Sequence, residues 1–301
     1  EYIDVRYMSY AITKYFIILF FIIPFSFLIN HIFKKSDIEF LLMLMFSISC
    51  VLFIISIFYI NTFLSSRTGI LGGGPIILSR WLCFGAIIIL FLPQRIKFRI
   101  LFSLLFFAMA SLTGSRGPLV SVLIVFIIYT ILNFRKFFRR FITIFTILIL
   151  LLISNINFFQ NMSPILRIFN NLTIKSLLES PRIILFKDSI EMIIEYPFGV
   201  GCGNFSAFSN TNLFFTKMKA YPHNVFLEVF IEYGVICGFL FLIFIIISMY
   251  KGYRNILKNK LKYSELFFFL AIYLLINSMF SGDLVDARIL LIIIPLLTKE
   301  Y

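Results

Sequence analysis

The chain is mostly apolar, and one of its few polar stretches carries a residue suited to proton transfer. His223 lies in the stretch Tyr221-Pro222-His223-Asn224, directly before a long apolar run. Pro222 fixes the backbone before that run and Asn224 is a typical N-cap, so the pattern predicts that His223 lies at the mouth of a helix. An imidazole there can take a proton from a hydroxyl group near neutral pH. The alternative is a polar residue that only caps the helix at a membrane interface.

Two arginines have surroundings that suit a phosphate or pyrophosphate group. Arg116 lies in Ser115-Arg116-Gly117, directly before Pro118, where two apolar runs meet. Arg182 follows Ser180-Pro181, which predicts a helix start with Ser as N-cap and Pro in the first turn. A guanidinium group binds phosphate oxygens through paired hydrogen bonds, and the N–H groups at a helix start attract anions. The alternatives are a headgroup anchor for Arg116 and a solvated first-turn residue for Arg182.

Four further residues are candidates for contacts with a substrate. Arg67 and Arg80 bracket a Gly-rich loop that could approach an anionic ligand. Asn224 and Glu228 are one helical turn apart, and Glu232 follows one turn later, so the three side chains share a helix face. Carboxylates inside an apolar span mark either a function or a pairing, and the alternative for Glu228 is a structural pair with a neighbouring helix.

Several kinds of site are not supported by the sequence. The four cysteines are scattered and the chain has only two histidines, so neither a disulfide framework nor a His-rich metal centre is expected. No Walker loop, Ser-His-Asp set or aspartate pair for a metal-bound nucleotide sugar is present. The formal net charge is +13 without a nucleic-acid-binding motif, so we expect the basic residues to meet phosphates or anionic headgroups. No metal, cofactor or nucleic acid is therefore predicted.

Composition predicts the fold class. The sequence is 61% hydrophobic with a mean hydropathy of +1.02, which excludes an ordinary soluble domain. We predict an all-α, polytopic transmembrane helix bundle of about nine spans. The expected spans are Tyr15–Phe33, Phe40–Ile60, Ser79–Leu92, Ile100–Leu112, Pro118–Phe134, Phe141–Phe158, Asn224–Tyr250, Ser264–Ser281 and Leu284–Thr298. One membrane domain would then hold residues 1–158 with spans 1–6, a loop of residues 159–221, and residues 222–301 with spans 7–9.

The distribution of Lys and Arg predicts the orientation. Most of them cluster in one set of connections between spans, which we expect to be cytoplasmic. The loop of residues 159–221 then faces the periplasm or the cell exterior, together with Arg116, Arg182 and His223. Because the sequence starts at Glu1 without a charged segment or cleavage signal, we expect an N-terminally truncated protein with an odd number of helices upstream.

The long loop is predicted to carry an amphipathic helix that ends at Pro197. Its apolar residues recur at helical spacing: Ile183, Phe186, Ile190, Ile193 and Ile194. Its charged residues fall largely on the other side: Lys187, Asp188, Glu191 and Glu195. Such a helix lies on the membrane or on the helix bundle. Three alternating glycines follow as a tight turn, and no strand precedes them as a dinucleotide fingerprint would require.

At these residues the chain resembles the O-antigen ligase and polymerase superfamily of bacterial inner membranes. The resemblance covers roughly Leu112 to Leu242, with weaker similarity between Arg67 and Arg80. The matching motifs are Ser115-Arg116-Gly117, Arg182, Pro197-x-Gly199-x-Gly201-x-Gly203-Asn204-Phe205, Pro222-His223-Asn224-x-x-Leu227-Glu228, Gly234 and Gly238. Their order and outward placement make the set more specific than any single motif.

The resemblance implies a metal-independent glycosyltransferase with its active site at the periplasmic face of the inner membrane. Its donor would be an undecaprenyl-pyrophosphate-linked oligosaccharide, with Arg116 and Arg182 binding the pyrophosphate and His223 assisting the acceptor hydroxyl. Attack at the anomeric carbon opposite the pyrophosphate would invert its configuration. The expected partners are this lipid-linked glycan, membrane lipids and, as a further candidate, a chain-length regulator protein.

Several functions fit this resemblance. A Gly-Gly-Gly-Pro loop, a modest outer loop and Phe/Ile-rich spans favour an O-antigen or polysaccharide polymerase, which moves the growing glycan onto a new lipid-linked repeat. The first alternative is an O-antigen ligase, which moves the finished chain onto lipid A-core. A transporter of lipid-linked glycans is another alternative and predicts charges through the membrane midplane. A non-catalytic scaffold is the last.

Overall fold

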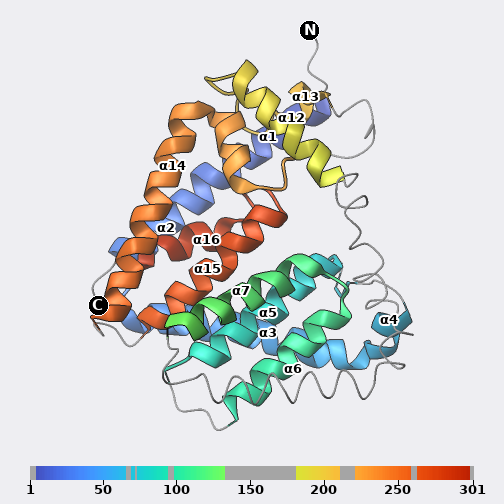
Figure 1. Cartoon of the computed structure of the whole chain (residues 1–301), viewed down its shortest axis with the longest axis vertical. Helices are drawn as coiled ribbons and strands as arrows, with labels where there is room; N and C mark the ends of the chain where they lie inside the picture. The colour runs from blue at the N-terminus through green and yellow to red at the C-terminus, as the bar shows by residue number, and fades with distance from the viewer. Residues whose placement is uncertain are drawn as a thin grey trace. The chain divides into compact units, whose positions relative to one another are not determined.

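The computed structural model describes residues 5–65, 69–71, 73–93, 98–132, 181–210, 221–258 and 263–298 (Figure 1). All regular elements in these residues are helices, which confirms the predicted all-α class. The chain forms two compact units, one of residues 1–38 with 174–301 and one of residues 39–173. The predicted domain boundary at residue 158 lies outside the described residues.

Helix α5 is the buried centre of the unit of residues 39–173. A Cβ atom on Gly85 would lie 2.8 Å from Ser49 Cβ and 2.9 Å from the Phe106 ring, so the absence of a side chain lets α3 and α6 approach. The Ser103 hydroxyl donates to the carbonyl of Ala86 at 2.9 Å. Small residues and serine hydrogen bonds of this kind are typical of helix packing in membranes. The helices of this unit are α3 (Lys35–Phe58, which begins in the other unit), α4 (Ile60–Ser65), α5 (Pro75–Phe91), α6 (Arg99–Leu112) and α7 (Arg116–Leu132).

The other unit contains two separate parts of the sequence. Its first part is α1 (Val5–Ile17), a π-helical turn (Ile18–Ile22) and α2 (Ile23–His31), which follow one another without a break. Pro24 lies at the start of α2 and has no N–H group, so the wider turn before it accommodates the missing hydrogen bond. The second part consists of α12 (Pro181–Glu195), α13 (Phe205–Phe208), α14 (Val225–Leu257), α15 (Ser264–Phe280) and α16 (Arg288–Leu296).

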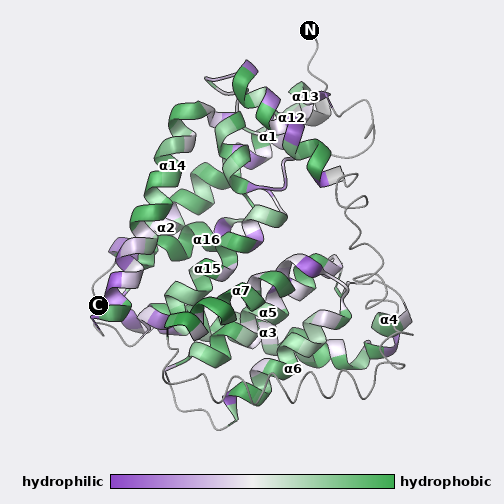
Figure 2. Ribbon diagram, in the orientation of Figure 1, coloured by the Kyte–Doolittle hydropathy of each residue, from purple (hydrophilic) through white to green (hydrophobic). Residues whose placement is uncertain are grey.

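Three helical stretches are long and apolar enough to cross a membrane: Met8–His31, Lys35–Phe58 and Val225–Leu257. Shorter apolar helices are Pro75–Phe91, Arg99–Leu112, Arg116–Leu132 and Ser264–Phe280. Figure 2 shows apolar residues over most of these helices, with hydrophilic residues gathered at ends such as the last turns of α14. The protein is therefore a helical membrane protein. The predicted span Phe141–Phe158 lies outside the described residues, and the total of nine spans stays a prediction.

Helix α14 is not one straight span, contrary to the prediction for Asn224–Tyr250. Gly234 inside it has φ 88° and ψ 168°, a conformation that only glycine adopts readily. The rings of Phe226 and Phe241 lie 5.6 Å apart, although in a straight helix these residues would be about 22 Å apart along the axis. Residues 225–233, here called the half-helix, therefore fold back on residues 235–257. The half-helix is about 13 Å long and is too short to cross a bilayer, so only residues 235–257 can do so.

Candidate functional site

The half-helix begins at Val225, two residues after His223. The Asn224 side chain accepts hydrogen bonds from the backbone N–H groups of Phe226 at 2.9 Å and Leu227 at 3.3 Å, which confirms the predicted N-cap. His223 itself has φ 56°, in the left-handed region that few residues other than glycine adopt. Its ring centroid lies 4.2 Å from that of Tyr221. The backbone therefore fixes His223 in a sparsely populated conformation at the mouth of the helix, as is common at functional sites.

A buried ion cluster holds the same half-helix against α1. The Lys14 ammonium group donates to Oε1 and Oε2 of Glu232, at 2.7 and 2.6 Å, and also to Oε1 of Glu228. Lys14, Glu228 and Glu232 are 1%, 0% and 3% exposed. The structure thus shows the pairing that the sequence left open for Glu228, and the contacts of Glu228 and Asn224 with substrate stay predictions. We call these three residues the Lys14 cluster.

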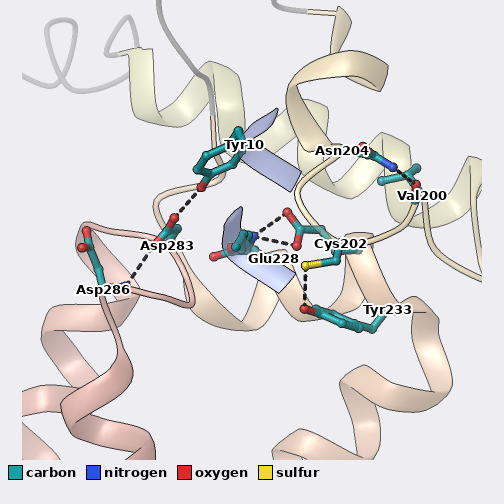
Figure 3. A network of polar contacts seen from close by, with 10 residues as sticks. Tyr10, Val200, Cys202, Asn204, Glu228, Tyr233, Asp283 and Asp286 are labelled. Carbon is teal, nitrogen blue, oxygen red and sulfur yellow. Dashed lines mark hydrogen bonds and ion pairs between the residues drawn. The ribbon is translucent and has the colours of Figure 1, made fainter. Parts of the chain in front are cut away.

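The same face of α1 holds the connection between α15 and α16. Tyr10, one turn before Lys14, donates its hydroxyl hydrogen to Oδ2 of Asp283. Oδ1 of Asp283 in turn accepts from the backbone N–H of Asp286 at 2.8 Å (Figure 3). The Lys14 ammonium also lies 5.9 Å from the centre of the Tyr10 ring. Helix α1 therefore joins the half-helix to the α15–α16 connection through polar groups.

The loop of residues 197–203 replaces the hydrogen bonds that α14 loses at its break. The N–H of Val235 donates to the carbonyl of Pro197 at 2.9 Å, and the Ile231 carbonyl accepts from Val200 at 2.9 Å. The Glu232 carbonyl accepts from Gly201 at 3.0 Å. Carbonyl groups at the end of a helix need such partners when they are buried. The loop therefore caps the C-terminal end of the half-helix.

The glycines of this loop allow close backbone approach. A Cβ atom on Gly199 would lie 2.6 Å from the Gly234 nitrogen, and one on Gly203 would lie 2.6 Å from the Ala11 Cα atom of α1. The N–H of Gly203 also donates to the Glu232 side chain. The Pro-x-Gly-x-Gly-x-Gly motif is therefore a packing motif that fits between α1 and the break in α14.

Helix α12 packs on the half-helix and carries Arg182 in its first turn. The core between them contains Leu185, Met192, Phe205 and Ile231. Arg182 is exposed. Helix α12 is described from Pro181 onward, and Ser180 lies outside the described residues, so the predicted helix start stays a prediction.

The faces of α12 differ in part from the prediction. Asp188, expected among the solvated charges, is buried and accepts hydrogen bonds from the Ser209 hydroxyl and, at 3.2 Å, from the N–H of Asn210. The reason is local, because Asp188 provides acceptors for polar groups that follow α13. Three residues of the predicted apolar stripe stay uncovered, since Phe186, Ile190 and Ile194 are 44%, 44% and 76% exposed, whereas Ile193 packs against the core between α12 and the half-helix. An uncovered stripe of this kind fits a helix that contacts lipid.

The remaining predicted arginines belong to the unit of residues 39–173. Arg116 is half-buried at the start of α7, after a turn in which Gly114 has φ 69° and Ser115 is buried. Arg80 is half-buried in α5, and Arg67 lies outside the described residues. His223, Asn224, Glu228 and Arg182 belong to the other unit. The convergence of Arg116 with Arg182 and His223 stays a prediction.

Sequence reasoning missed Lys14 and Tyr10. The available signal was a single lysine within the apolar stretch Met8–His31, because an ionisable residue inside a span marks a function or a partner. Its partner could not be found from spacing, since Glu228 lies 214 residues away. Over the described ranges, no group of three or more His, Cys, Asp and Glu side chains could hold a metal ion.

Comparison with known proteins supports one family. No curated protein matches the chain, and no solved structure does. Residues 101–243 match the family model described as O-antigen ligase, and this segment includes Arg116, Arg182 and His223. Residues 101–243 are therefore similar to the O-antigen ligase family, which supports the resemblance to the O-antigen polymerase and ligase superfamily.

Proposed function

We propose that this protein is an O-antigen or polysaccharide polymerase. It would transfer a growing glycan from undecaprenyl pyrophosphate to a lipid-linked acceptor repeat at the periplasmic face of the bacterial inner membrane. The family match supports the broad class of glycan transfer. The observation that carries the site is His223, held in a left-handed backbone conformation at the capped start of the half-helix.

The proposed reaction is a displacement at the anomeric carbon. The acceptor hydroxyl gives its proton to His223 while its oxygen attacks that carbon. The bond between the carbon and the pyrophosphate oxygen breaks, its electron pair stays on the oxygen, and undecaprenyl pyrophosphate leaves. Arg116 and Arg182 neutralise the charge that develops on the leaving group, so the proposed step requires no metal. Attack opposite the leaving group inverts the configuration.

Arg182, together with Arg67 and Arg80 of the unit of residues 39–173, would provide positive charge for the anionic donor. Arg182 is exposed in the first described turn of α12, and its guanidinium group and the N–H groups of the helix start are proposed to attract the donor pyrophosphate together. Arg67 and Arg80 are proposed as further contacts for the pyrophosphate or for acidic sugars of the glycan.

The test uses the full-length protein in a strain that lacks its own copy. We expect His223→Ala and Arg182→Ala each to shorten the glycan to single repeats on a gel, at normal expression. Glu191→Gln is the matched control, because it removes an exposed charge from α12 without touching the proposed site. Glycans of normal length in both site variants would contradict the proposal.

A ligase is the second candidate, because the matching family model is described as O-antigen ligase. The two functions differ in what a deletion leaves behind. Lipid A-core that carries single repeats but no long chains indicates loss of a polymerase. Loss of every attached repeat indicates loss of a ligase.

A transporter is the third candidate, since an interrupted helix and buried charges within spans also occur in transporters. In this protein the loop of residues 197–203 hydrogen-bonds the backbone groups at the break in α14. Lys14 binds the carboxylates of Glu228 and Glu232. Both sets of groups therefore already have partners within the protein, which argues against a transported ion or substrate at these groups. Flipping of lipid-linked glycan in vesicles that survives His223→Ala would favour the transporter.

A further inference from the structure

The half-helix needs support from elsewhere in the protein. Isolated helices shorter than about 12 residues are marginally stable in water, and this one has only the length of residues 225–233. Asn224 caps one end and the loop of residues 197–203 caps the other. Val225 and Val229 also pack against Leu284 and Ala287, and Ile231 packs against α12. These contacts and the caps together orient the half-helix, which begins two residues after His223.

The Lys14 cluster adds buried polar contacts on one face of the half-helix. Glu228 and Glu232 are four residues apart and so project from the same face of the half-helix, toward α1. Lys14 bonds to both, and it bonds to Glu232 through both carboxylate oxygens. Apolar contacts allow a helix to slide or rotate a little, whereas a buried ion pair has one favourable geometry, and buried polar groups are known to set register in other helical proteins.

We propose that the Lys14–Glu232 ion pair positions His223 for proton transfer. The inference rests on the proposed function, in which His223 is the base. Lys14 and Glu232 are positioning residues and touch neither substrate nor the reacting atoms in this proposal. Along the helix axis, Glu228 lies about 4.5 Å and Glu232 about 10.5 Å from Val225, the first residue of the half-helix, so a shift of the cluster would pass to the start of the half-helix. A displacement of about 1 Å at a catalytic group can lower a rate about 100-fold.

The two carboxylates contribute unequally. Glu232 accepts at both oxygens and also receives the N–H of Gly203. Glu228 accepts from Lys14 at Oε1, and its buried Oε2 has no hydrogen-bond partner within the described part of the chain. Glu232 is therefore the main anchor. A change at Glu228 is expected to act in the same direction but less strongly.

The test measures turnover and donor affinity of the purified full-length protein in vesicles, per amount of folded protein. We expect Glu232→Gln to lower kcat about 100-fold while the KM for the lipid-linked donor stays within about threefold. Glu191→Gln, the same substitution at an exposed site on α12, is expected to leave both unchanged. Lys14→Arg keeps the charge and is expected to retain most of the activity that Lys14→Met loses.

A double variant separates positioning from general stability. If Glu232 acts through His223, then His223→Ala with Glu232→Gln is no slower than His223→Ala alone. Losses that multiply in the double variant would overturn the proposal, as would a full kcat in Glu232→Gln. If Glu232→Gln does not fold, Glu232→Asp replaces it, since it keeps the charge and shortens the reach by one methylene group. If His223→Ala alone has no effect, the proposed function fails, which is a distinguishable outcome.

Discussion

Lys14 and Glu232 lie 218 residues apart in the sequence, and the Lys14 ammonium group bonds to both oxygens of the Glu232 carboxylate, at 2.7 and 2.6 Å. This pair joins the first helix of the chain to the half-helix that follows His223. Predictions about stability and activity follow from this connection and from the two caps of the half-helix.

Lys14→Met is expected to destabilise the protein strongly. It leaves Glu228 and Glu232 buried together without a positive partner, and removal of one partner of a buried ion pair costs roughly 3–5 kcal/mol. The measurement is the thermal unfolding midpoint in detergent. Lys187→Met on the exposed side of α12 is the control and should change the midpoint little. Equal midpoints for the two variants would show that the ion pair does not stabilise the fold.

Gly234→Ala should prevent the fold-back of α14. A Cβ atom at this position would lie 2.7 Å from the Phe198 carbonyl carbon, and the backbone conformation is accessible only to glycine. We expect less monodisperse protein in size-exclusion chromatography, with a loss of at least about 2 kcal/mol of stability. Gly74→Ala is the matched control, because nothing lies within 4 Å of a Cβ atom there.

His223→Asn is expected to separate folding from catalysis. Asparagine tolerates the left-handed backbone conformation of His223, so stability should stay close to that of the wild type. An amide cannot accept a proton near neutral pH, so turnover should fall about 10²–10⁴-fold. The measurement is glycan synthesis in vesicles beside thermal unfolding. A folded and fully active Asn variant would exclude His223 as the base.

Asn224→Ala removes the cap at the start of the half-helix. Loss of an N-cap side chain costs about 1 kcal/mol, and Asn224→Asp should keep most of the stability because a carboxylate accepts the same backbone N–H groups. Thermal unfolding compares the two variants. The cap has no such role if Ala and Asp behave alike.

The Cys202 thiol provides a pH-dependent probe of the loop that caps the half-helix. Burial raises the pKa of Cys202, while the hydrogen bond that Tyr233 donates to its sulfur at 3.1 Å lowers it. Thiolate is therefore scarce at neutral pH, and alkylation should accelerate only at a higher pH than for an ordinary cysteine. Tyr233→Phe removes the hydrogen bond that lowers the pKa of Cys202, so the pH at which alkylation reaches half its maximal rate should rise further. The experiment measures alkylation by iodoacetamide against pH in a variant whose other cysteines are replaced. A pH midpoint of alkylation below that of a free cysteine would contradict the raised pKa of Cys202.

Local signals predicted the local structure. Asn224 before an apolar run is a helix cap, and Pro181 with Pro197 bracket α12, because these residues act through the backbone of their own neighbourhood. The apolar composition predicted membrane helices because each long apolar run is a property of its own stretch of sequence. Gly234 gave no clear signal, since glycine within an apolar run occurs both in straight helices and at breaks.

Long-range relationships could not be predicted. Lys14 was visible as a lone charge in an apolar stretch, but the choice of Glu228 and Glu232 as its partners depends on how α1 packs. The charge of Asp188 favours the polar side of α12. Asp188 is nevertheless buried, because its carboxylate accepts hydrogen bonds from the Ser209 hydroxyl and the Asn210 N–H. The convergence of Arg116 and Arg182 with His223 likewise cannot be derived from spacing and stays a prediction.

The separation of Lys14 from its partners also has a consequence for synthesis of the protein. Glu228 is translated 214 residues after Lys14, a delay of about 10–40 s at ordinary rates of elongation. During that interval the apolar stretch Met8–His31 enters the bilayer before Glu228 and Glu232, the partners of Lys14, have been made. Its final depth is therefore set late, when the half-helix arrives. A chain that terminates before Glu228 would keep the Lys14 ammonium group in the apolar stretch without either of these two partners.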